Sequence, residues 1–152
     1  ARMVFTEYDI PRQGRPISAH TGTFWTDGQS TRYESKRARD TWADSKGHLW
    51  ISGWDSGEVY RYTPASGEWK SWKLPGEEPK AYAVYVDERD IVWVSDFGAN
   101  ATLAFDPATE SWTSYPGSGP EANVRQILGR PGEVYLPESG TDRLMIVYTG
   151  SQ

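Results

Sequence analysis

Two stretches of this chain repeat each other at an interval of 43 residues. The segment GHLWISGW with YRYTPASGEWKSWKLPG recurs as DIVWVSDF with LAFDPATESWTSYPG. Seven residue pairs share the interval, and most of them are uncommon residue types: Asp44/Asp87, Trp50/Trp93, Ser52/Ser95, Trp54/Phe97, Pro64/Pro107, Trp69/Trp112 and Trp72/Tyr115. A fixed period of this length indicates a solenoid, a propeller or another array of structural repeats.

Two further copies of the unit are incomplete. In ILGRPGEVYLPESG, Tyr135 follows Trp93 by 42 residues, and this copy ends in RLMIVYTG. At the other end of the chain, FTEYDIP places Phe5, Tyr8 and Pro11 at the spacing of Trp69, Trp72 and Pro75. We therefore expect one domain over residues 1–152. It divides into a partial unit at 1–41 and repeats at about 42–85, 86–127 and 128–149.

Each complete unit is predicted to contain four short strands. Residues 48–52, 59–62 and 68–74 are apolar or alternating runs separated by turn sequences rich in Gly, Pro, Ser and Asp, and residues 81–86 supply a fourth run. The chain also has 8 Trp, 9 Tyr, 15 Gly and 10 Pro, a composition that favours strands and turns over long helices. Four strands in about 43 residues are typical of a β-propeller blade, so the predicted fold class is all-β.

The number of blades leaves the ring unfinished. The chain holds about three and a half four-stranded blades, and propellers close at four or more. An open half-ring would expose an apolar blade face and unpaired strand edges. We expect either that a second copy closes the ring by two-fold symmetry, or that this chain is the C-terminal part of a longer propeller.

The repeated aromatic and acidic residues have structural roles in this scheme. Trp50, Trp93 and Tyr135 are expected on the strands nearest the channel, where they would pack between neighbouring blades. Asp44 and Asp87 are expected to open tight turns by accepting hydrogen bonds from their own backbone.

Composition excludes several classes of function. The chain has no Cys, which excludes disulfides, thiolate metal sites and a cysteine nucleophile. The formal net charge of −5 argues against a broad nucleic-acid surface. No run reaches the roughly 18 apolar residues of a membrane span, and ARMVFTEYDIP lacks the apolar core of a secretory signal. We expect a soluble protein of the bacterial cytoplasm or periplasm, with no nucleic-acid or membrane partner.

The units DSKGHLWISGWDSGEVYRYTPASGEWKSWKLPG and VDERDIVWVSDFGANATLAFDPATESWTSYPG resemble the repeats of the virginiamycin B lyase (streptogramin lyase) family. The resemblance covers residues 42–149 well and residues 1–41 weakly, and it implies the C-terminal half of a seven-bladed propeller. It also implies a Mg²⁺-dependent site in which a Glu-x-His pattern follows a strand. The matching positions are Gly53-Trp54-Asp55, Asp96-Phe97-Gly98 and Glu138-Ser139-Gly140, and no Glu-x-His occurs in the chain.

Four residues at these matching positions are the candidate ligand-binding residues. Asp96 and Glu138 follow a strand directly and are also the candidate metal ligands, although a turn-capping role is the alternative. Trp54 and Phe97 could offer rings to a flat ligand or a sugar, with packing as the alternative. His20 is the candidate catalytic residue, because a neutral imidazole suits proton abstraction.

Arg32, Lys36, Arg37 and Arg39 fall within eight residues of one another. This basic loop, residues 30–39, is interpreted as a solvated segment or as an anion or partner site.

Two functions remain open on the sequence alone. The first is a lyase-like propeller that binds a small ligand on one face without the antibiotic-opening activity. The second is a noncatalytic binding or scaffold module that acts through self-association or a protein partner. A carbohydrate site at Trp54 and Phe97 is a third hypothesis.

Overall fold

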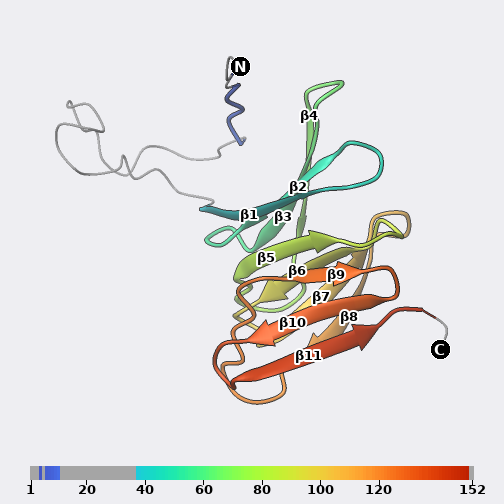
Figure 1. Ribbon diagram of the computed structural model, residues 1–152. Coiled ribbons are helices and arrows are strands. Elements are labelled where there is room, and N and C mark those ends of the chain that lie inside the picture. Colours follow the sequence, from blue (N-terminus) through green and yellow to red (C-terminus); the bar gives the residue numbers. More distant parts are fainter. Residues whose placement is uncertain (1–3, 5, 11–36, 151–152) are drawn as a thin grey trace, which may run out of the picture. The chain divides into compact units, whose positions relative to one another are not determined.

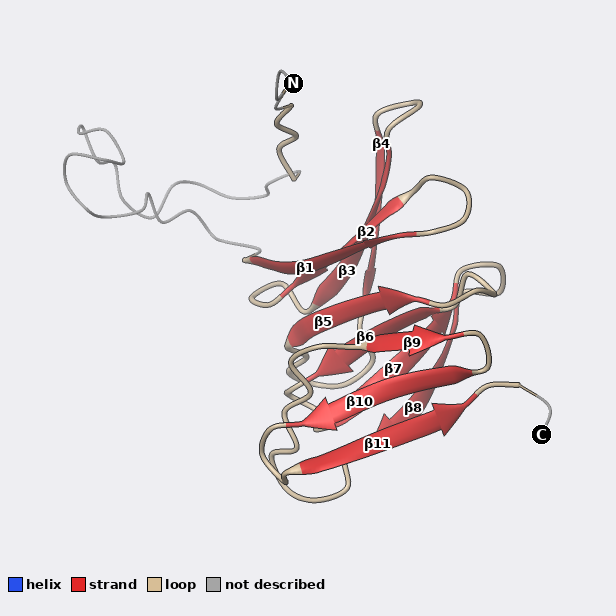
Figure 2. Ribbon diagram, in the orientation of Figure 1, coloured by secondary structure: helices blue, strands red, loops and turns tan. Residues whose placement is uncertain are grey.

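The computed structural model describes residue 4, residues 6–10 and residues 37–150. The chain divides into two compact units, Ala1–Ser35 and Lys36–Gln152. In the first unit the described residues form no helix or strand, and in the second every regular element is a β-strand (Figures 1 and 2). Over these residues no helix is long and apolar enough to cross a membrane.

Three antiparallel sheets make up the second unit, and the strands of each follow chain order. The first sheet contains β1 (Ala38–Ala43), β2 (Leu49–Gly53), β3 (Glu58–Thr63) and β4 (Glu68–Lys73). The second contains β5 (Ala81–Val86), β6 (Val92–Asp96), β7 (Ala101–Asp106) and β8 (Ser111–Pro116). The third has three strands, β9 (Leu128–Arg130), β10 (Glu133–Glu138) and β11 (Arg143–Tyr148).

This arrangement is a partial β-propeller, so the all-β prediction is confirmed. The second sheet lies between the other two, and β1 and β5 approach each other most closely of the strands from different sheets. Each sheet begins with its first strand at 38, 81 or 128. The sequence repeat that was counted from residue 42 therefore begins near the end of β1 and includes β5, which is the first strand of the second sheet.

The turn between the first two strands explains why aspartate recurs at this position. The Asp44 Oδ1 accepts hydrogen bonds from the backbone N–H groups of Lys46 and His48, and its Oδ2 accepts one from the Trp50 indole at 3.0 Å. Asp87 repeats this pattern, and its Oδ2 accepts from the Trp93 indole at 3.0 Å. Each aspartate thus stabilises a turn and orients the buried tryptophan six residues later.

The first two sheets are joined by an aromatic core. Trp50 is fully buried and stacks on Trp72, with ring centroids 5.4 Å apart. Phe105 of the second sheet contacts both of these rings, and its own neighbour Trp112 lies 4.5 Å away. Val59, Leu74, Val92 and Val94 complete the cluster. Burial of these side chains holds the two sheets face to face.

The second and third sheets repeat this contact with smaller side chains. Trp93 contacts Tyr115 at 5.3 Å, in the way that Trp50 contacts Trp72. On the facing side the cluster contains Val134, Leu136 and Val147. A cavity of about 390 Å³ remains beside them.

Trp50, Trp93 and Tyr135 lie on β2, β6 and β10, the second strands of their sheets in chain order. Trp50 and Trp93 are buried between sheets as expected, whereas Tyr135 is only partly buried. The expected partial blade at 1–41 falls almost entirely outside the described residues.

Candidate functional site

One rim of the second unit gathers the ends of the second strands and the starts of the first strands. Because β1 and β2 are antiparallel, as are β5 and β6, the residues after Gly53 and Asp96 lie beside those that open β1 and β5. Trp54 and Phe97 occupy the first of these positions, and Arg39 and Tyr82 occupy the second. The fold therefore collects side chains from different sheets at a single rim.

Three rings meet at this rim. Tyr82 and Phe97 are stacked, with centroids 4.9 Å apart and planes inclined by 11°. Trp54 meets both of them edge-on, at 5.8 Å from Tyr82 and 5.3 Å from Phe97. All three side chains are partly buried. The structure thus brings together the two rings that the sequence proposed, Trp54 and Phe97, and adds a third.

Two exposed arginines cover the rings. The Arg39 Cζ lies 5.2 Å from the Trp54 ring centroid and 5.3 Å from that of Tyr82. The Arg125 Cζ lies 5.6 Å from the Tyr82 centroid and 5.5 Å from that of Phe97. These distances are within the range of cation–π attraction. We call these five residues the aromatic–arginine cluster.

Repeat spacing explains how the cluster is assembled. Arg39, Tyr82 and Arg125 are separated by 43 residues each, and Trp54 and Phe97 are separated by the same interval. The first position therefore contributes one side chain from each sheet or from the loop before it, and the second contributes one side chain from each of the first two sheets. Sequence reasoning missed Tyr82 and Arg125, although the same interval could have found them.

The charges of the two arginines are not balanced by nearby carboxylates. Among the described residues, neither Arg39 nor Arg125 forms an ion pair. The Arg125 Nε donates a hydrogen bond to the Ser139 Oγ at 3.2 Å. From the predicted basic loop, Arg37 pairs with Asp55 at 3.3 Å, while Arg32 and Lys36 lie outside the described residues. The rim therefore presents positive charge on a chain of net charge −5.

Asp96 is directed toward its own loop. Its Oδ1 accepts hydrogen bonds from the backbone N–H groups of Lys80, Gly98 and Ala99, at 2.8, 2.9 and 3.3 Å. Its Oδ2 is buried and has no hydrogen-bond partner within the described part of the chain. The residue is only 1% exposed.

Glu138 is also held by hydrogen bonds, and they link it to the loop after β8 and to Thr141. Its Oε1 accepts from the Ser118 backbone N–H at 2.9 Å, and its Oε2 accepts from the Ser118 and Thr141 hydroxyls. Burial raises the pKa of this carboxyl, but the hydrogen bonds from Ser118 and Thr141 outweigh that effect and leave the pKa of Glu138 below its usual range. Glu138 is therefore an anchored carboxylate and not a poised acid.

The backbone after both carboxylates leaves no room for a side chain. A Cβ added at Gly98 would overlap the carbonyl oxygen of Glu78, and one added at Gly140 would overlap that of Glu121. Gly140 stands where the resemblance would place a histidine. The local backbone thus accounts for the missing Glu-x-His pattern.

A magnesium site does not form from the described residues. No group of three or more His, Asp or Glu side chains converges among them. Asp96 and Glu138 direct their oxygens mainly at backbone groups and hydroxyls, so this donor set does not fit Mg²⁺. The candidate His20 lies outside the described residues. His48 has its Nδ1 2.8 Å from the Asp44 Oδ2 and takes part in the turn.

The 390 Å³ cavity lies between the second and third sheets. Asp96, Phe97 and Glu138 line it at one end, and Tyr115, Met145 and Val147 are among its apolar wall. Trp54 is not part of its lining. Three of the four candidate ligand-binding residues are therefore close to this cavity, and two of the four belong to the aromatic–arginine cluster.

Comparison with solved structures agrees with the architecture. A streptogramin B lyase structure superposes with a TM-score of 0.71 at 16% identity, over 79% of this chain and 40% of that chain. The fold is a virginiamycin B lyase-like propeller. The virginiamycin B lyase from Staphylococcus aureus gives a TM-score of 0.61 at 14% identity, over 76% of this chain and 42% of that one.

An auxiliary nutrient binding protein from Bacteroides thetaiotaomicron also superposes, with a TM-score of 0.51 at 12% identity over 72% of this chain and 33% of that protein. No family model and no curated protein matches the sequence. The chain spans less than half of each of these structures. At such low identities the likeness establishes the fold, and function must be argued from the site.

Proposed function

We propose that this propeller binds a small anionic ligand with a flat or apolar body at the aromatic–arginine cluster. The observation that carries the proposal is the position of two exposed guanidinium groups, those of Arg39 and Arg125, over three clustered rings. Guanidinium groups bind carboxylates and phosphates through paired N–H donors. The half-buried rings of Trp54, Tyr82 and Phe97 offer faces and edges for a ligand body.

Lyase activity is not part of the proposal. Both oxygens of Glu138 accept hydrogen bonds from Ser118 or Thr141, and Gly140 has no space for an imidazole. The proposed role is therefore ligand binding on one rim. The name of the nutrient binding protein that shares this fold is consistent with such a role.

Calorimetric titration with benzoate and its neutral analogue benzamide tests the proposal. Benzoate is expected to bind much more tightly than benzamide, because only the carboxylate offers a negative charge and two equivalent acceptor oxygens to the guanidinium groups. Arg39→Gln and Arg125→Gln are each expected to lower the affinity about tenfold, which is typical for a lost hydrogen bond to a charged group.

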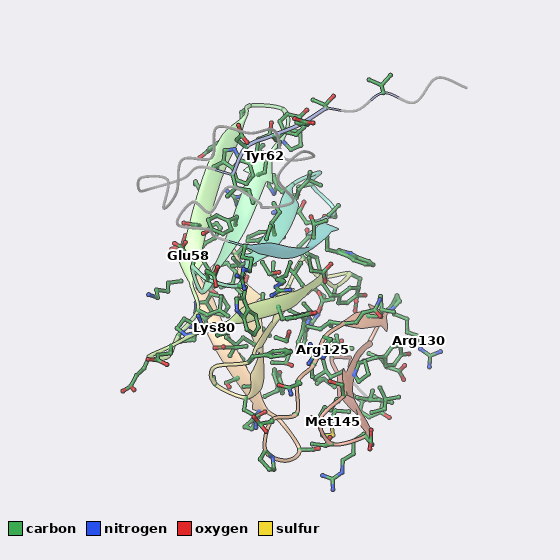
Figure 3. All side chains as sticks on the ribbon, turned by 90° about the vertical axis from the view of Figure 1, so that its left-hand side faces the viewer. Glu58, Tyr62, Lys80, Arg125, Arg130 and Met145 are labelled. Carbon is green, nitrogen blue, oxygen red and sulfur yellow. The ribbon has the colours of Figure 1, made fainter. Side chains whose placement is uncertain are left out.

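Arg130→Gln is the matched control, because Arg130 is an exposed arginine that pairs with Glu133 at 2.6 Å. Figure 3 shows Arg130 and Arg125 apart from each other on the molecule. The Arg130→Gln change is expected to leave the affinity for benzoate unchanged. Equal binding of benzoate and benzamide, or equal loss of affinity in all three variants, would contradict the proposal.

A further inference from the structure

The third sheet has one strand fewer than the other two. Within the described part of the chain its outermost strand, β11, pairs with β10 alone, whereas β3 and β7 each pair with a fourth strand (Figure 1). The side of this sheet that faces away from the second sheet carries several exposed apolar side chains beside the Arg130–Glu133 ion pair. Leu144 is 60% exposed and Tyr148 57%, and Leu128 and Ile146 extend the surface. We call these four residues the outer apolar face.

The fourth strands of the complete sheets share a pattern. In β4, Trp69 lies opposite Tyr62 with ring centroids 4.7 Å apart, and Trp72 follows three residues later opposite Val59. In β8, Trp112 lies opposite Phe105 at 4.5 Å, and Tyr115 follows opposite Thr102. The two aromatic residues point to opposite faces of the sheet. In β8 they therefore serve both interfaces, Trp112 the one with the first sheet and Tyr115 the one with the third.

The segment Val4–Asp9 carries the same pattern. Phe5 corresponds to Trp69 and Trp112, and Tyr8 to Trp72 and Tyr115. Glu7 takes the position of Ser71 and Ser114, which are polar in both fourth strands. Phe5 itself lies outside the described residues, and its part in the argument is its place in the sequence.

The register of the complete sheets fixes where this segment would lie. Val134 on β10 corresponds to Val92 on β6, and their partners Val147 and Phe105 therefore correspond as well. A fourth strand in this register places Phe5 opposite Val147 and Tyr8 opposite Leu144. It also places Asp9 opposite Arg143, which is a favourable charge pair between neighbouring strands.

The same register directs Phe5 toward the second sheet. Val147 and Met145 line the cavity, and Phe5 would share their face of the sheet. In the first interface that position is held by Trp112, which packs against Phe105. In the second interface the cavity lies on the face of β11 where the equivalent ring is expected. Tyr8 would extend the outer apolar face instead.

We infer that a second copy of this chain supplies Val4–Asp9 as the fourth strand beside β11. Pairing within one chain would satisfy the edge of β11 and leave the outer apolar face in water. A second copy satisfies the edge and also brings sheets of its own to cover that face. The chain covers only 40% of the streptogramin B lyase chain, so one copy supplies less than half of such a propeller.

Cysteine cross-linking tests this inference, and the chain is suited to it because it has no cysteine. Tyr8→Cys and Leu144→Cys are introduced in separate chains, which are mixed and oxidised. A disulfide-linked product of two chains is expected, because directly opposed residues have Cβ atoms about 4.5–5.5 Å apart. A mixture that gives no such product overturns the inference. In a chain that carries both substitutions, a disulfide formed within that chain would overturn the choice of a second copy.

Tyr8→Cys mixed with Met145→Cys is the matched control. Met145 is the next residue along β11 and points to the opposite face, so no link is expected. Cross-linking as efficient as that of Leu144→Cys would overturn the register.

Sedimentation provides a measurement on the unmodified chain, which is expected at twice its 17.1 kDa mass. Asp9→Arg or Arg143→Asp should weaken association up to about fivefold, and the two changes together should restore it. A monomer at all concentrations overturns the inference. These results do not depend on benzoate binding, so this inference and the proposed function can fail separately.

Discussion

The side chain of Asp87 connects a turn to the core of the second sheet. Its carboxylate accepts hydrogen bonds from two backbone N–H groups, those of Arg89 and Ile91. It also accepts one from the Trp93 indole and one from the Arg89 guanidinium, the latter at 2.7 Å. Its side chain is 1% exposed. Burial raises the pKa of this carboxyl, but hydrogen bonds from Trp93, Arg89 and the backbone outweigh the effect and lower the pKa of Asp87.

Replacing this carboxylate is expected to destabilise the protein in a pH-dependent way. Asp87→Asn should lower the free energy of unfolding by about 1–3 kcal/mol at pH 7, because hydrogen bonds to a charged acceptor are lost. Since the pKa is lower in the folded state, the carboxylate stabilises the protein above the unfolded-state value near 3.8, and this contribution disappears as pH falls through the folded-state value. The difference between the two proteins should therefore shrink in acid.

Urea denaturation at pH 7 and at pH 3 measures this difference. Asp142→Asn is a suitable control, because Asp142 is exposed and has a φ of 53°, which asparagine also tolerates. A constant difference across this pH range would show that the charge of Asp87 is not what matters.

At the scale of single elements, β7 holds the first two sheets together through one side chain. Phe105 is fully buried and contacts Trp50, Trp72 and Trp112. Phe97, which lies at the rim, is only partly buried. Comparing alanine variants of the two phenylalanines therefore separates the loss of stability caused by a core cavity from the loss caused by removing a partly exposed ring.

Phe105→Ala is expected to lower the free energy of unfolding by about 3–5 kcal/mol, because the rings around it can relax only partly into the space. Phe97→Ala should cost less and should weaken benzoate binding instead. Urea unfolding followed by tryptophan fluorescence measures both effects. Equal destabilisation by the two variants would argue against the core position of Phe105.

At the scale of the whole molecule, the sheets form a linear array in which the second contacts both of the others. Stability in such arrays is approximately a sum of the sheets and the interfaces between neighbours. A change at one interface should therefore affect the two sheets that share it more than the third.

Hydrogen exchange can test this expectation. Val134→Ala, at the interface of the second and third sheets, should increase amide exchange mainly in β9–β11 and leave β1–β4 close to the parent protein. Phe105→Ala should instead increase exchange in β1–β4 and β5–β8. A uniform increase over all three sheets in both variants would indicate one cooperative unit.

Most of the architecture could be predicted because the repeat interval is carried by large and rare residues. The pairs Trp50/Trp93 and Asp44/Asp87 mark the same strand and turn in two sheets, so periodicity alone gave four strands per unit. Spacing along the chain does not say which strand of a sheet lies innermost, so the expectation that Trp50 lies nearest the channel stays a prediction.

The candidate site was only partly predictable. Trp54 and Phe97 were found as repeat-equivalent rings, but their partner Tyr82 lies in an apolar strand sequence and looked like core. Arg125 lies before β9, a short strand that contains no aromatic residue to identify it as part of the repeat. The hydrogen bonds that hold Asp96 and Glu138 depend on loop backbones that sequence patterns do not specify.

The alternation of Arg39, Tyr82 and Arg125 has a consequence for how such a protein could diversify. At this repeat position each sheet, or the loop before it, contributes one side chain to the rim. Trp50 and Trp93, which pack between the sheets, lie on β2 and β6 instead. A substitution in a single repeat can thus exchange a cation for a ring, or the reverse, without disturbing the interior. The ligand preference that we propose for this rim could therefore change one repeat at a time.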